Sequence, residues 1–153
     1  MAKERSLVFV KPGNFQRSLE IFCCLDELLG EGTFTKTMPV HIYRVPEEVV
    51  RQHYAHTEGQ LFYGAQIQAF VNGDVVLTVY EGEKIIGRIR TAVGNTNPQK
   101  ADSRTVRKIF ANVDDSFDDV FGASEYLNNF IHASATAEEA KKEIAIWRRF
   151  LNC

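Results

Sequence analysis

The chain alternates short runs of apolar and β-branched residues with longer segments in which apolar residues recur at helical spacing. Residues 6–10 and 75–80 are typical of buried strands, and residues 130–131 form a last apolar run that leads into His132. Residues 18–29, 61–71 and 84–93 are predicted to be helices. Strands and helices in this order predict an α+β fold, in which helices pack against an antiparallel sheet.

Turn and cap residues set the limits of further elements. Gly30 should end the first helix, and Pro46 should begin another at its first helical position, with acids in the first turn. Thr136 and Glu139 have the spacing of a capping box, which predicts a helix running to Trp147. Residues 33–44 are strand-like and residues 105–110 are expected to form a turn.

Length and charge restrict the class of protein. The 153 residues suit one domain, 1–153, with a substantial core, and 44% hydrophobic with 25% charged residues is typical of a globular chain. A formal net charge of -2 and a pI near 6.1 argue against bulk attraction to nucleic acid. An RNA-binding module of the same fold class is therefore disfavoured.

The cysteines and the N-terminal residues indicate a cytoplasmic protein. The three cysteines are odd in number, Cys23 and Cys24 are adjacent, and no pair has zinc-binding spacing. Neither a disulfide framework nor a structural metal is expected, which fits a reducing compartment. The first residues lead into a strand without a long apolar stretch, so we expect neither a signal peptide nor a membrane span.

His132 ends a short apolar run, and Glu143 follows it by eleven residues. A histidine in this setting is more often a core residue than a reactive one. Other motifs in the chain change that interpretation. Lys11-Pro12 follows the first strand, Arg90 stands six residues before Thr96-Asn97-Pro98, and Arg107 follows Thr105-Val106. Together with Asn129 three residues before His132, these ordered motifs resemble nucleoside diphosphate kinases over most of the chain.

The resemblance implies a ferredoxin-like βαββαβ core and a kinase that moves a γ-phosphate between nucleotides by a ping-pong mechanism. His132 would attack phosphorus as a neutral imidazole and form phosphohistidine. Glu143 matches the glutamate that supports the attacking ring nitrogen, and Ser134 matches the serine that assists it. Without the resemblance, Glu143 would equally suit a surface ion pair with Arg148, and Ser134 a plain strand-end hydroxyl.

The family's nucleotide-binding residues also have counterparts. Guanidinium groups grip phosphate oxygens in pairs, so arginines suit this role better than lysines. The resemblance assigns phosphates to Arg90, Arg107 and Thr96, the ribose to Lys11 and Asn129, the transferred phosphate to Tyr54, and base stacking to Phe62. Stacking tolerates every base, which implies broad nucleotide specificity.

Mg²⁺ should arrive with the nucleotide and keep several waters, so no protein metal cage is expected. The histidines outside the motif, His41, His53 and His56, do not have metal-binding spacing and are interpreted as structural or solvent-facing. The resemblance further implies a homo-oligomer, tetrameric or hexameric, that acts on nucleoside di- and triphosphates.

Several positions depart from the family pattern: Gly13, Lys108, Ile109, Asn128 and Ala133. They leave open a rival hypothesis, a catalytically weak nucleotide-binding or regulatory protein on the same scaffold. About a dozen extra residues, near 112–127, precede the last strand and predict an inserted loop with a short helix, either a solvated decoration or a functional lid. Near its end, Tyr126 is expected to cover the base opposite Phe62.

Overall fold

The computed structural model describes residues 3–61, 63–71, 73–94, 102–110 and 130–152. Its described strands form one antiparallel sheet in the order β2-β4-β1-β5, with β3 also paired to β4. The strands are β1 (Lys3–Val10), β2 (Thr35–Lys36), β3 (Val40–Ile42), β4 (Val75–Glu83) and β5 (Ile131–Ala133). Counting β2 and β3 together as the second core strand, this is the expected ferredoxin-like order.

The central strand β1 explains the apolar run near the N-terminus. Residues 6–10 are all buried, because both faces of this strand are covered. Val8 and Val10 join one core cluster, whereas Leu7 and Phe9 join a second cluster on the opposite face. The sequence located this strand correctly, although the structure extends it to Lys3 along its ladder with β4.

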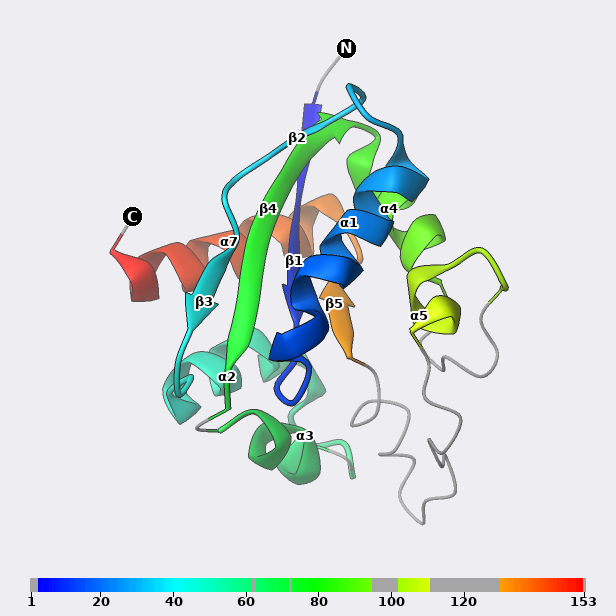
Figure 1. Cartoon of the computed structure of the whole chain (residues 1–153). Coiled ribbons are helices and arrows are strands. Elements are labelled where there is room, and N and C mark those ends of the chain that lie inside the picture. The colour runs from blue at the N-terminus through cyan, green and yellow to red at the C-terminus, as the bar shows by residue number, and fades with distance from the viewer. Residues whose placement is uncertain (1–2, 62, 72, 95–101, 111–129, 153) are drawn as a thin grey trace.

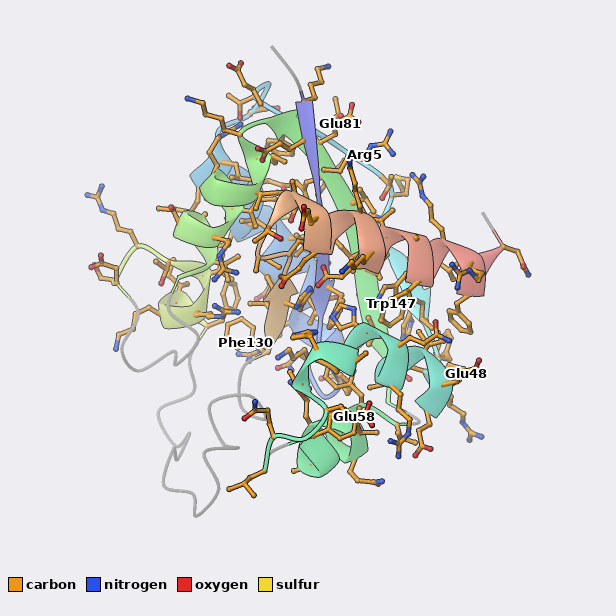
Figure 2. All side chains as sticks on the ribbon, turned by 180° about the vertical axis from the view of Figure 1, so that it is seen from behind. Arg5, Glu48, Glu58, Glu81, Phe130 and Trp147 are labelled. Carbon is orange, nitrogen blue, oxygen red and sulfur yellow. The ribbon has the colours of Figure 1, made fainter. Side chains whose placement is uncertain are left out.

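Helices cover both faces of the sheet (Figure 1). The α-helices are α1 (Ser18–Leu29), α2 (Glu47–His53), α3 (Tyr63–Phe70), α4 (Ile85–Val93), α5 (Val106–Ile109) and α7 (Ala137–Leu151). Two short 3₁₀ helices, η1 (Phe15–Arg17) and η2 (Ala55–Thr57), follow β1 and α2. Residues of α1 and α4 pack into the first core cluster, and residues of α2, α3 and α7 pack into the second. Figure 2, turned by 180°, shows α7 in front of the sheet, with Trp147 between α7 and α2.

The predicted caps are largely confirmed. Gly30 ends α1 with a φ of 95°, a conformation that glycine adopts without steric cost. The Thr136 side chain accepts a hydrogen bond from the Glu139 backbone N–H at the start of α7. Pro46 lies at the N-cap of α2 and not, as expected, at its first helical position. Among the described residues, no helix is both long and apolar enough to cross a membrane.

Residues 33–44, which were expected to be strand-like, form strand in two separate parts. Two short strands, β2 and β3, pair with β4 in place of one continuous strand, because Pro39 has no N–H with which to continue the ladder. The Thr37 hydroxyl accepts a hydrogen bond from the Val79 N–H at 3.0 Å at the break. The expected turn at residues 105–110 is the short helix α5, capped by the Thr105 side chain. The insert near 112–127 lies outside the described residues.

Candidate active site

His132 lies on β5, directly opposite Phe9 of β1. Its ring stacks on the Phe9 ring, with centroids 4.7 Å apart and planes 23° from parallel. Backbone bonds hold the strand on both sides of the histidine, from the Lys11 N–H to Phe130 O at 2.8 Å and from the Ser134 N–H to Leu7 O at 3.1 Å. The imidazole is therefore fixed by the sheet and not by a loop.

Glu143 points from α7 toward His132 and is 5% exposed. Its Oε1 lies 3.1 Å from His132 Nε2 and accepts a hydrogen bond from Ser134 Oγ at 2.7 Å. The Ser134 hydroxyl in turn accepts the Leu7 N–H at 2.9 Å. The structure therefore excludes the surface ion pair with Arg148 as the role of Glu143, and it brings together the three residues expected to perform the chemistry.

The ionisation of these groups follows from their burial. Burial, followed by the nearby charges of Lys11 and Arg107, holds the pKa of His132 well below its usual value, so the ring is neutral at pH 7. Burial raises the pKa of Glu143, while His53 and the Ser134 hydrogen bond act against that rise. A neutral imidazole beside a buried carboxyl group is the protonation state that a nucleophilic histidine needs.

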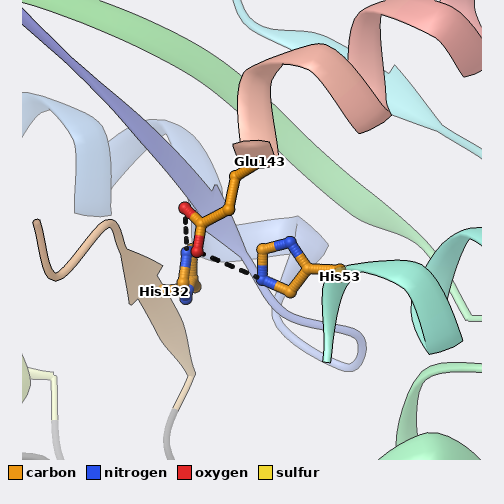
Figure 3. Close-up of side chains that lie close together, drawn as sticks. All are labelled: His53, His132 and Glu143. Atoms are coloured by element: carbon orange, nitrogen blue, oxygen red, sulfur yellow. Dashed lines mark hydrogen bonds and ion pairs between the residues drawn. The ribbon is translucent and has the colours of Figure 1, made fainter. Parts of the chain in front are cut away.

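His53 is the third member of this cluster, and the sequence analysis did not place it there (Figure 3). It is 3% exposed at the end of α2, so of the two alternatives for this residue, structural or solvent-facing, the structure excludes the second. Its Nδ1 accepts the Trp147 indole N–H at 3.0 Å, and its Nε2 lies 4.0 Å from Glu143 Oε2. The available signal was helical spacing, since His53 shares the buried face of α2 with Val49 and Val50.

A cavity of about 160 Å³ opens beside His132. Four predicted nucleotide-binding residues line it: Lys11, Tyr54, Arg90 and Arg107. Further lining side chains, which the sequence did not assign to the site, are His56, Thr57, Gln66 and Glu139. His56 was interpreted as structural or solvent-facing; it is exposed, and it lies at this cavity.

Cations crowd one side of the cavity. Lys11 is 9% exposed, and burial together with the charge of Arg107 lowers its pKa to about 7. Burial and the charge of Arg90 lower the pKa of Arg107 to about 10. Mutual repulsion in a partly dry site is relieved by an anion, so this side of the cavity suits phosphate.

Arg107 also has a structural role. Its guanidinium donates to Gly94 O at 2.6 Å and to Ile131 O at 2.9 Å, which ties the end of α4 to β5 next to His132. Arg90, in the last turn of α4, is exposed. The Arg90 side chain is thus accessible to a ligand, whereas two N–H groups of Arg107 donate to backbone carbonyls.

Tyr54 is 5% exposed, and its hydroxyl finds no hydrogen-bond partner among the residues that the structure describes. Burial, followed by the charge of Glu143, raises the pKa of this hydroxyl. A buried hydroxyl that is neutral and unpaired is available to donate to a ligand oxygen in the cavity.

The ligand atoms of His53, His132 and Glu143 lie within 4.8 Å of one another, close enough to be tested as a metal site. An indole N–H can only donate, so Trp147 requires a lone pair on His53 Nδ1 and leaves the proton on Nε2. A protonated nitrogen cannot bind a metal, so this cluster does not suit a transition metal.

Four predicted site residues, Phe62, Thr96, Tyr126 and Asn129, lie outside the described residues, as does Asn128, and their roles stay predictions. Among the departures, Gly13 has a φ of 89°, which other residues rarely adopt. Ala133 is buried on β5, whereas Lys108 and Ile109 are exposed on α5. None of these three side chains lies between His132 and Glu143.

The fold and the cluster define a class, a ferredoxin-like protein with a sheet-mounted histidine–carboxylate pair beside a cation-lined cavity. Residues 4–150 match the family model described as nucleoside diphosphate kinase. The nucleoside diphosphate kinase of Mycobacterium tuberculosis H37Rv is 32% identical over 147 residues, which cover 94% of this chain and 96% of the relative. The enzyme of Clostridium perfringens strain 13 is 33% identical over 147 residues, covering 96% and 92%.

Solved structures agree with the sequence relatives. The nucleoside diphosphate kinase of Aquifex aeolicus superposes with a TM-score of 0.76 at 27% identity, over 95% of both chains. That of Encephalitozoon cuniculi gives 0.73 at 26% identity, over 94% of this chain and 88% of the other. The chain therefore belongs to the nucleoside diphosphate kinase family. It is an enzyme of that family, a nucleotide-binding phosphotransferase.

Proposed function

We propose that the protein transfers the γ-phosphate of a nucleoside triphosphate to a nucleoside diphosphate through a phosphohistidine at His132. The observation that carries this proposal is the pairing of a neutral, sheet-held His132 with the buried Glu143 at a cavity lined by Lys11, Arg90 and Arg107. Nucleophile, orienting carboxylate and phosphate-binding cations then meet at one place.

The hydrogen bond to Glu143 selects the attacking nitrogen. A carboxylate can only accept, so His132 Nε2 carries the proton and the lone pair lies on Nδ1. Nδ1 attacks the γ-phosphorus, the bond from that phosphorus to the bridging oxygen breaks, and the diphosphate leaves with the electron pair. This revises the expectation from sequence, in which the glutamate supported the attacking nitrogen itself.

Glu143 then stabilises the product of the first step. The phosphorylated imidazole bears positive charge, because its proton remains on Nε2. This N–H donates to the Glu143 carboxylate, which a hydrogen bond from Ser134 holds in place. A second nucleoside diphosphate attacks the same phosphorus in the reverse direction and leaves as a triphosphate. Charge on the transferring group is offset by the cations of the cavity, an effect worth about 3 kcal/mol per well-placed donor.

Magnesium would arrive with the nucleotide, and the chemistry it would supply is positive charge to offset that of the phosphates. The lining fits a hydrated ion better than a directly bound one. Within the described lining, Glu139 is the one carboxylate other than Glu143, and as a half-buried group it would contact the water shell of the ion.

The surface of the sheet edge supports assembly into a homo-oligomer. On the part of the chain that the structure describes, β2 and β3 pair only with β4, so their outer edge is free to pair. Large apolar side chains are exposed along this edge and on the adjoining helix: Leu19 by 73%, Met38 by 83% and Tyr43 by 70%. We propose a homo-oligomer acting in the cytoplasm, and sedimentation showing only monomer at micromolar concentration would contradict the assembly.

Two-substrate kinetics test the proposed reaction. Initial rates with one nucleoside triphosphate and the diphosphate of a different base should give parallel double-reciprocal lines, as expected for a ping-pong mechanism. His132→Ala should abolish the transfer and retain nucleotide binding. Intersecting lines would reject the covalent intermediate, and binding without transfer by the wild type would favour the weak-binder rival.

A further inference from the structure

His53 has no part in the steps above, yet it is packed against both residues that perform them. Its ring meets the His132 ring edge to face, with centroids 4.6 Å apart, and it meets the Phe9 ring at 5.2 Å. Its Nε2 is buried and finds no hydrogen-bond partner among the described residues. A buried polar atom without a partner costs folding free energy and calls for a reason.

The state of His53 follows from its contacts. Burial, followed by the charge of His132, lowers the pKa of His53 well below its usual value, so the ring is neutral. Trp147 donates to Nδ1 at 3.0 Å, so the single ring proton is on Nε2. The i to i+4 spacing on α7 places Trp147 and Glu143 on the same helical face. Trp147 reaches this imidazole through its hydrogen bond, and Figure 3 shows Glu143 beside the same ring.

The Nε2 proton of His53 therefore faces Glu143. The distance of 4.0 Å to Oε2 is too long for a hydrogen bond, but it places the positive end of an N–H dipole at a buried carboxylate. Donor groups therefore face both carboxylate oxygens of Glu143: Ser134 and His132 at Oε1, and His53 near Oε2. A protonated Glu143 would place its own hydrogen against one of these donors.

We propose that His53, held in one tautomer by Trp147, is a positioning residue that keeps Glu143 a carboxylate directed at His132 Nε2. Through Glu143 it fixes His132 in the tautomer whose Nδ1 bears the lone pair. The inference rests on the proposed phosphohistidine mechanism and extends it to two buried side chains 94 positions apart in the sequence.

A matched pair of variants separates positioning from packing. In His53→Asn the amide oxygen can replace Nδ1 as acceptor for the indole, but no donor reaches Glu143. In His53→Gln the longer side chain can place an N–H where Nε2 stood. We expect His53→Asn to lower kcat about tenfold or more with KM unchanged, the scale typical of orienting partners, and His53→Gln to restore much of the loss.

The pH profile gives a readout that packing alone does not alter. The titratable and charged groups around Glu143 come from several elements: His132 of β5, His53 of α2, Tyr54, His56 of η2, Lys11, Arg90 of α4, Arg107 of α5 and Glu139 of α7. Loss of the His53 donor should move the acid limb of kcat to higher pH, because Glu143 then protonates more easily. The limb should return toward its wild-type position in His53→Gln.

Nitrogen-15 NMR of the histidine rings tests the tautomers without turnover. The wild type should show His53 and His132 both protonated at Nε2. In His53→Asn, the His132 ring should be a mixture of the Nδ1-protonated and Nε2-protonated tautomers. If His53→Asn does not fold, Trp147→Phe removes only the indole donor and should mix the His53 tautomers. A folded His53→Asn with unchanged pH profile and His132 tautomer overturns the inference, whereas failure of wild-type His132 to accept phosphate overturns the proposed function.

Discussion

Nucleotide binding should draw a proton onto Lys11 at pH 8. The amine is buried, with Nζ 6.0 Å from the Phe70 ring centroid, and its pKa is about 7. At pH 8 about one-tenth of the Lys11 side chains therefore carry a proton before binding. Lys11 was expected to bind the ribose, but it lines the same cavity as Arg90 and Arg107, where the phosphates should lie. Their negative charge favours the charged amine and returns its pKa toward the ordinary value, so binding should take up about 0.9 proton.

The pH dependence makes this prediction specific. At pH 6 about nine-tenths of Lys11 is already charged, so the uptake due to this residue should fall to about 0.1 proton. Titration calorimetry of Mg²⁺-nucleotide binding at pH 8, in two buffers of different ionisation enthalpy, measures the uptake. Terminal phosphates are almost fully ionised at that pH and contribute little.

Lys11→Met is the matched control, because it keeps the length of the side chain and removes the titrating group. Binding to this variant should be weaker and should lose the proton uptake. At pH 7 the variant should also unfold at higher temperature, because folding lowers the pKa of Lys11. Between about pH 7 and 10 the unfolded state binds more protons than the folded state, so the wild type gains stability as pH rises. The difference in unfolding temperature between the variant and the wild type therefore narrows. Equal proton uptake in both proteins would refute the assignment.

Arg107→Ala should lower kcat/KM by an amount equivalent to about 2 to 4 kcal/mol of transition-state stabilisation, and by more than Phe62→Ala does. The change removes a cation that stabilises the transition state and also the hydrogen bonds that join α4 to β5. Steady-state kinetics of both variants, with Arg107→Lys as the charge-retaining control, measure this; equal effects confined to KM would contradict it. Gly94→Ala should destabilise the fold by about 1 to 3 kcal/mol, since φ is 97° and the new Cβ would lie 2.6 Å from Thr105. Thermal unfolding that matches the wild type would contradict the clash.

Periodicity and spacing predicted the parts of the molecule that depend on neighbours in the sequence. The helix Ser18–Leu29, the central strand and the Thr136 cap could be located because residues close together in the sequence determine each of them. The meeting of His132 with Glu143 and Ser134 was expected from the family motif, and the structure shows those contacts.

Contacts between distant segments could not be predicted in this way. Trp147 orients His53 from 94 residues away, and no local pattern links them. The acceptors of Arg107 are the backbone carbonyls of Gly94 and Ile131. Every residue has such a carbonyl, so the side chains in the sequence do not indicate which ones accept. The break between β2 and β3 depends on which N–H groups the ladder needs, and this requires knowledge of the register with β4.

The most direct test of a phosphohistidine mechanism is to locate the phosphate itself. The protein is mixed with γ-labelled nucleoside triphosphate and Mg²⁺ without acceptor, separated under alkaline conditions and mapped by mass spectrometry. We predict acid-labile, alkali-stable label on Nδ1 of His132, and its complete transfer to an added nucleoside diphosphate. Label on another residue, label that a diphosphate does not remove, or full phosphoryl transfer by His132→Ala would contradict the mechanism.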